Sequence, residues 1–177
     1  MSLAPALLAG CVAAPSLGDD PSVRPLEVLP GDATPSVVEA DLLATARERY
    51  GPAALQRALA APTHIIVKRF AGMAPPPPPG AAPGWMAATP SALLMRDDGR
   101  WLIATPDGWR DADRDAAAEI DAAMASREFW NEPAASFPCP DYGASLMLLK
   151  APQRARTVRN SKCPSISDRI VQAALRA

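Results

Sequence analysis

The chain has 177 residues, with 18 Lys or Arg against 19 Asp or Glu, and its formal net charge at pH 7 is -1. This length suits one domain with a tail, and the balanced charge excludes the strong basic field of a typical nucleic-acid-binding protein. Hydrophobic residues make up 49% of the chain but aromatic residues only 5%. We therefore expect one modest core, built from short Leu, Ile, Val and Met segments, and no nucleic-acid partner.

The chain begins with an apolar segment that ends in Leu8-Ala9-Gly10-Cys11. An apolar stretch followed by small residues is typical of an export signal. These four residues resemble the lipobox of bacterial lipoproteins, in which the cysteine receives a diacylglycerol group and becomes the new N-terminus after cleavage. The resemblance implies lipidation of Cys11 and a place in the cell envelope, anchored to a membrane and facing the periplasm or another extracytoplasmic space.

Two other interpretations of this segment stay open. An ordinary signal peptidase could cut the export signal, although Pro15 after Ala13-Ala14 disfavours the most obvious site. The segment could also be an untargeted alanine-rich tail, since residues 1–18 carry no Lys or Arg. If Cys11 is acylated, each buried methylene contributes about 0.8 kcal/mol, so two or three acyl chains would hold the protein on a membrane.

Composition divides the chain into three parts. Residues 1–10 form the predicted export signal, and residues 11–35 are rich in Pro, Gly, Asp and Ser without a period. Such a composition predicts a flexible stalk between the lipid and the domain. Residues 36–177 then form a single predicted domain.

A helix is predicted at the start of this domain. Ser36 and Glu39 have the spacing of a capping box, in which each side chain accepts from the other residue's backbone amide. The helix is expected to reach about Tyr50, where Gly51-Pro52 breaks it, and a second short helical piece ends before Pro62.

Strands are predicted from β-branched segments and from turn signals. Asp98-Gly99 favours a tight hairpin, and Ala151-Pro152-Gln153 joins a second one. The proline-rich residues 75–83 lack amide donors for a ladder and are predicted to form a loop. The predicted strands are residues 63–70, 92–96, 101–105, 144–150 and 154–159.

Two further helices are predicted, at residues 111–126 and from Ser165 to the end, with Phe129 and Trp130 between them as core anchors. The order is then helix, strand, hairpin, helix, hairpin, helix. Because strands arrive as hairpins, the fold class is α+β. We expect a mainly antiparallel small sheet of two hairpins plus one further strand, with helices packed on one face.

The remaining cysteines, Cys139 and Cys163, form an even pair, which in an exported chain is best interpreted as a structural disulfide. Closing this loop would stabilise the fold by roughly 3 to 4 kcal/mol. Two free buried thiols are the alternative. A Cys-x-x-Cys redox motif is absent, and a metal site lacks a third thiol, so neither a metal nor a cofactor is expected.

Catalytic motifs are absent from the sequence. It contains no Gly-x-Ser-x-Gly, no Ser-x-x-Lys and no phosphate-binding glycine loop. The sole histidine, His64, is expected at a strand start, exposed or at the edge of the core. Asp111, Asp113 and Asp115 alternate like the start of a calcium loop, but Ala116 and Ala122 replace the required Gly and Glu. These acids are interpreted as the start of a helix.

One cluster of cations is a candidate for binding. It lies on or beside the last hairpin and could meet an anionic glycan, a lipid head group or an acidic protein surface. A solvated strand edge explains it equally well. Its members are Lys150, Arg154, Arg156, Arg159 and Lys162, with Arg154 and Arg156 on one face.

The preferred functional hypothesis is a non-catalytic envelope lipoprotein that binds, supports or inhibits a partner. Its partners would be the membrane, through the lipid, and an envelope protein or a cell-wall polymer. The alternative is a small envelope hydrolase with paired carboxylates, which requires two carboxyl groups about 5 to 10 Å apart in a cleft. The carboxylates considered are Asp97, Asp98, Asp115 and Glu119.

Overall fold

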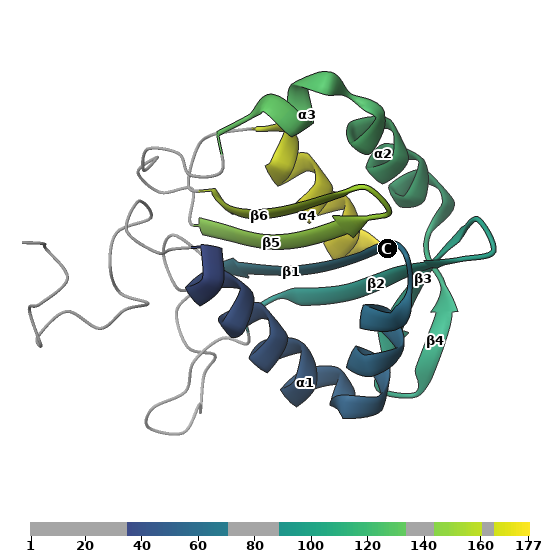
Figure 1. The fold of residues 1–177 in the computed structure, drawn as a ribbon. Helices are drawn as coiled ribbons and strands as arrows, with labels where there is room; N and C mark the ends of the chain where they lie inside the picture. Colours follow the sequence, from purple (N-terminus) through teal and green to yellow (C-terminus); the bar gives the residue numbers. More distant parts are fainter. Residues whose placement is uncertain (1–34, 71–88, 134–143, 161–164) are drawn as a thin grey trace, which may run out of the picture.

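The computed structural model describes residues 35–70, 89–133, 144–160 and 165–177. In these residues the protein has an α+β fold, with a six-stranded antiparallel sheet and helices on both of its faces (Figure 1). The helices are α1 (Pro35–Ala60), α2 (Arg114–Ala125), α3 (Arg127–Asn131) and α4 (Ile166–Arg176). The strands are β1 (His64–Phe70), β2 (Ser91–Asp97), β3 (Arg100–Thr105), β4 (Gly108–Asp111), β5 (Ala144–Ala151) and β6 (Arg154–Asn160).

Several predictions lie outside these residues. They are the export signal, the stalk up to residue 34, the loop at 75–83, and the side chains of Cys11, Cys139, Lys162 and Cys163.

The break in α1 lies where the sequence predicts it. Gly51 has φ 85° and ψ 160°, a conformation that side chains with a Cβ rarely adopt, and Pro52 follows it without an amide hydrogen. The helix begins at Pro35, so Ser36 lies inside its first turn rather than at the predicted cap. Val38, Leu42 and Ala46 share the buried face, as their spacing predicts.

The sheet has the order β4-β3-β2-β1-β5-β6, and each neighbouring pair is antiparallel. Both predicted hairpins are confirmed, as β2–β3 and β5–β6. Asp98 and Gly99 have φ angles of 47° and 78°, the positive values that a tight hairpin turn requires. Strand β1 lies at the centre of the sheet, so the two hairpins flank it.

Two details of the predicted secondary structure are wrong. A sixth strand, β4, occupies Gly108–Asp111, so Asp111 ends a strand and does not begin a helix. Helix α2 begins at Arg114, and Asp113 caps it by accepting from the amides of Asp115 and Ala116 at 3.0 Å. β4 escaped prediction because it has only four residues, of which Gly and Asp disfavour strands.

The prediction that the helices pack on one face is also wrong. Helix α1 covers one face, and α2, α3 and α4 cover the other (Figure 1). Along β1, Ile66 packs in the cluster beneath α1, while Ile65 and Val67 pack in the opposite cluster with Phe129 of α3. The consecutive burial of Ile65, Ile66 and Val67 follows because a sheet covered on both faces hides successive side chains.

Helix α4 carries the predicted cap and buried face. The hydroxyl of Ser165 accepts from the amide of Asp168 at 3.0 Å, as in a capping box. Ile170 and Ala174 are fully buried, and Ile166 packs against the same cluster. None of the helices in the described ranges combines the length and the hydropathy that crossing a membrane requires.

Candidate functional site

The described cations of the last hairpin are divided between the two faces of the sheet. Arg154 and Arg156 alternate with Val158, whose side chain lies in the core beneath α2, α3 and α4, so both point to that face. Lys150 alternates with Leu148, and Arg159 pairs with Leu146; both leucines belong to the core beneath α1. The predicted pairing of Arg154 with Arg156 on one face is thus observed, whereas Lys150 and Arg159 lie on the other.

Arg156 joins the hairpin to α3. Its guanidinium lies 5.0 Å from the centre of the Phe129 ring and donates to the backbone carbonyl of Glu132. Burial lowers the pKa of Arg156, and the charge of Glu132 partly opposes this shift. Nε of Arg156 has no hydrogen-bond partner among the described residues. Because most of its contacts are internal, Arg156 chiefly fixes the position of the hairpin.

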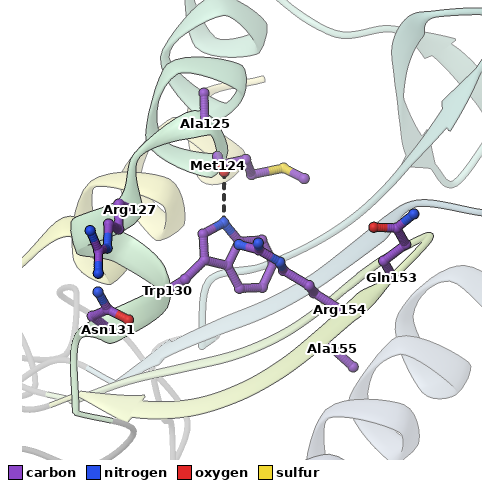
Figure 2. Close-up of a pocket in the computed structure, with 8 residues that line it drawn as sticks. All are labelled: Met124, Ala125, Arg127, Trp130, Asn131, Gln153, Arg154 and Ala155. Carbon is purple, nitrogen blue, oxygen red and sulfur yellow. Dashed lines mark hydrogen bonds between the residues drawn. The ribbon is translucent and has the colours of Figure 1, made fainter.

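Arg154 lies at the surface, stacked on Trp130. Its guanidinium carbon is 5.2 Å from the centre of the indole ring, within the range of a cation–π interaction. The indole is itself held in place, because Nε1 of Trp130 donates to the carbonyl oxygen of Met124 at 2.7 Å (Figure 2). The orientation of Arg154 is therefore set by a ring that is bonded to the end of α2.

These residues border a hollow of about 830 Å³ between the α2–α3 junction and the β5–β6 turn. In Figure 2, Arg127 and Asn131 project from α3, Gln153 and Arg154 come from the hairpin, and Trp130 lies between them. Two arginines and two amide residues thus border one hollow, and none of the described residues that line it carries a carboxylate. Guanidinium groups match carboxylate and phosphate geometry, so this arrangement suits an anion. The lining residues are Met124, Ala125, Arg127, Trp130, Asn131, Gln153, Arg154 and Ala155.

A second hollow, of about 560 Å³, lies between α1 and the β5–β6 hairpin. The hairpin cation Lys150 borders it, as do Glu39 of α1 and His64 of β1. His64 is the first residue of β1, as expected, but it is only 2% exposed and not at an open edge. Desolvation lowers the pKa of His64, the nearby charge of Lys150 lowers it further, and the backbone carbonyl of Ala61 opposes both.

The carboxylates of the hydrolase alternative do not line either hollow. Asp97 forms an ion pair with Arg57 at 3.3 Å, and Glu119 pairs with Arg176. Asp98 belongs to the β2–β3 turn, and Asp115 lies in the first turn of α2. Within the described ranges, no three His, Cys, Asp or Glu side chains are grouped closely enough to hold a metal ion.

The sequence identified the cations of the hairpin. It did not predict that Trp130 contacts Arg154, or that Asn131 and Gln153 line the same hollow. The only one of these residues that the sequence singled out was Trp130, next to Phe129, and it was predicted to be a core anchor. No protein-family model matches the chain, and neither the curated proteins nor the solved structures contain a match.

Proposed function

We propose that the chain is a lipid-anchored, non-catalytic binding module of the cell envelope, whose domain holds anionic groups of a cell-wall polymer beside Trp130. One observation carries the binding proposal. Arg127 and Arg154 border the same hollow, none of the described residues that line it carries a carboxylate to neutralise them, and Trp130 fixes the orientation of Arg154.

The chemistry of the hollow fits a polymer that carries both anions and hydroxyl groups. The guanidinium groups would bind carboxylate or phosphate oxygens, and the side-chain amides of Asn131 and Gln153 can donate to or accept from hydroxyls.

Binding to a defined anionic polymer tests this proposal. Polygalacturonate serves as the carboxylated probe and uncharged dextran as its control. Replacing Arg154 with Gln, or Arg127 with Gln, should weaken polygalacturonate binding by about 10-fold or more, since each charged contact contributes about 1.5 to 3 kcal/mol. Higher salt should weaken binding by the wild type.

Arg110→Gln provides the matched control, because Arg110 is exposed on β4, at the opposite edge of the sheet from the hairpin. This variant should bind like the wild type. Equal loss in the Arg110 and Arg154 variants would show only a general charge effect and would contradict the proposed site, as would tight binding to dextran.

The anchor proposal rests on the resemblance of Leu8-Ala9-Gly10-Cys11 to a lipobox. A diacylated cysteine would hold the protein on a membrane and place its domain in the periplasm or an equivalent space. Cys11→Ser should release the protein from the membrane fraction and remove the lipid mass from the intact protein. A variant that stays membrane-bound would contradict the anchor.

The proposed disulfide between Cys139 and Cys163 is supported by the residues that flank both segments. Ser145 is paired with Asn160 in the β5–β6 ladder, and Glu132 accepts from the amide of Ser167 at 3.0 Å. Cys139 precedes Ala144 by five positions and Cys163 follows Asn160 by three. The chain therefore has the reach to bring the two sulfurs together.

Intact mass before and after alkylation tests this pairing. The native protein should resist alkylation at both positions, and reduction should lower its free energy of unfolding by roughly 3 to 4 kcal/mol. Alkylation of both thiols without reduction would contradict it.

A further inference from the structure

The second hollow, between α1 and the β5–β6 hairpin, lies on the opposite face of the sheet from the hollow beside Trp130. Its walls come from four elements that are distant in sequence: α1, β1, β5 and β6. Apolar groups form part of its lining, including Leu59, which is 38% exposed, and Leu148, which is 7% exposed. The further lining residues are Glu39, His64, Lys150, Ala155, Arg156 and Thr157.

His64 borders this hollow and contains a buried polar atom without a partner. The side chain is 2% exposed, and its Nδ1 has no hydrogen-bond partner among the residues that the structure describes. The backbone carbonyls of Ala61 and Ala58 also lie near the imidazole, and both raise its pKa. A buried polar atom without a hydrogen-bond partner costs about 1 to 3 kcal/mol.

Two opposite charges border the same hollow. Glu39 and Lys150 are both exposed, and both act electrostatically on His64. Within the described part of the chain, neither forms an ion pair with another residue. The hollow therefore offers the anionic group of Glu39, the cationic group of Lys150 and an apolar wall. Arg156 also borders it, but its guanidinium donates to the carbonyl of Glu132 and lies on the Phe129 ring.

We propose that this hollow binds a free α-amino acid with an apolar side chain. The ligand's ammonium group lies near the carboxylate of Glu39. Its carboxylate binds the ammonium of Lys150 and the hydroxyl of Thr157, and its side chain packs on Leu59 and Leu148. Glu39, Lys150 and the apolar wall then each have a complementary group on the ligand.

Three related probes separate the contributions of the ligand's two charges. L-leucine carries both charges, N-acetyl-L-leucine lacks the ammonium, and L-leucinamide lacks the carboxylate. In a nuclear magnetic resonance titration of the full chain, L-leucine should shift the amide signals of Leu148 and Thr157. Both analogues should bind at least about 10-fold more weakly, since each loses a charge-assisted contact.

Variants at the rim test the proposal without disturbing the core. Lys150→Gln and Glu39→Gln should each weaken L-leucine binding by about 10-fold, because each removes one charged partner. Glu48→Gln and Arg110→Gln, at exposed positions away from this hollow, should leave it unchanged.

Three results would overturn the proposal: no shift of the Leu148 and Thr157 signals by millimolar L-leucine, equal affinity for all three probes, or unchanged binding by Lys150→Gln. The polygalacturonate experiment reports on the other hollow, so failure of either proposal leaves the other standing.

Discussion

The guanidinium of Arg154 lies 5.2 Å from the centre of the Trp130 ring, and this contact joins the β5–β6 turn to α3. Trp130 is held in turn by its hydrogen bond to the carbonyl oxygen of Met124, at 2.7 Å. A cation placed on a fixed ring loses less conformational freedom when it binds a ligand than a free surface arginine does. The proposed anion site is therefore preorganised by contacts between three elements.

Trp130→Phe should lower the free energy of unfolding by about 1 kcal/mol, because it keeps an aromatic ring but removes the N–H that bonds to Met124. Urea denaturation measures this change. Trp109→Phe is the matched control: Trp109 is also half-buried and lies beneath Arg57, but its indole nitrogen makes no hydrogen bond to the described residues. Equal losses in the two variants would argue against a specific role for the Met124 bond.

Two buried serines beside β1 should respond differently to replacement by alanine. Ser145 is 4% exposed, and its hydroxyl donates to a carboxylate oxygen of Asp168 at 3.0 Å. Ser91 is 9% exposed, and its hydroxyl has no partner among the described residues. Ser145→Ala should cost about 1.5 to 3 kcal/mol, since it removes a donor to a buried charged group.

Ser91→Ala should change the free energy of unfolding by less than about 0.5 kcal/mol or raise it, because an unsatisfied hydroxyl contributes nothing when buried. Chemical denaturation of both variants checks the pair. If Ser91→Ala proved as costly as Ser145→Ala, burial alone and not the bond to Asp168 would explain the loss.

The hairpins and the break in α1 were predictable because local chemistry determines them. Asp98-Gly99 accepts positive φ angles, and Gly51-Pro52 interrupts a helix whatever surrounds it. The covering of both sheet faces is not local, since it depends on which face each helix meets. The consecutive apolar residues of β1, β2 and β5 indicate that both faces of the sheet are covered, because a strand exposed on one face would alternate apolar and polar residues.

The candidate sites were less predictable than the fold. The two-residue period placed Arg154 and Arg156 together, but it could not show that Trp130, 24 positions before Arg154, supports one of them. It also could not show that Lys150 faces the opposite hollow with Glu39 and His64. Both arrangements depend on tertiary packing between elements that no local pattern connects.

The carboxylate of Glu132, just after α3, caps the N-terminus of α4. It accepts from the amides of Ile166 at 3.2 Å and Ser167 at 3.0 Å, and a negative charge is favourable at this end of a helix. Glu132→Gln should therefore lower the free energy of unfolding by about 1 kcal/mol. Glu128→Gln, at an exposed position of α3, should have little effect. Equal stability of the Glu132 variant and the wild type would contradict this cap.

Below about pH 6.5, His64 should make the fold less stable. Burial lowers its pKa in the folded state below the ordinary histidine value of 6.5, so the unfolded chain takes up the proton first as the pH falls. The neighbours that face the ring are Glu39, Lys150 and the carbonyls of Ala58 and Ala61. The free energy of unfolding should then decrease by up to about 1.4 kcal/mol per pH unit, until the folded-state pKa is reached.

This dependence can be assigned to one residue, because His64 is the sole histidine and Asp and Glu ordinarily titrate nearer pH 4. Urea denaturation at intervals between pH 7.5 and 5.5 should show a flat region above about pH 7 and a decline below it. His64→Gln should remove most of the decline, even if its stability at pH 7.5 is lower. An unchanged slope in that variant would mean that some other group takes up the proton on unfolding.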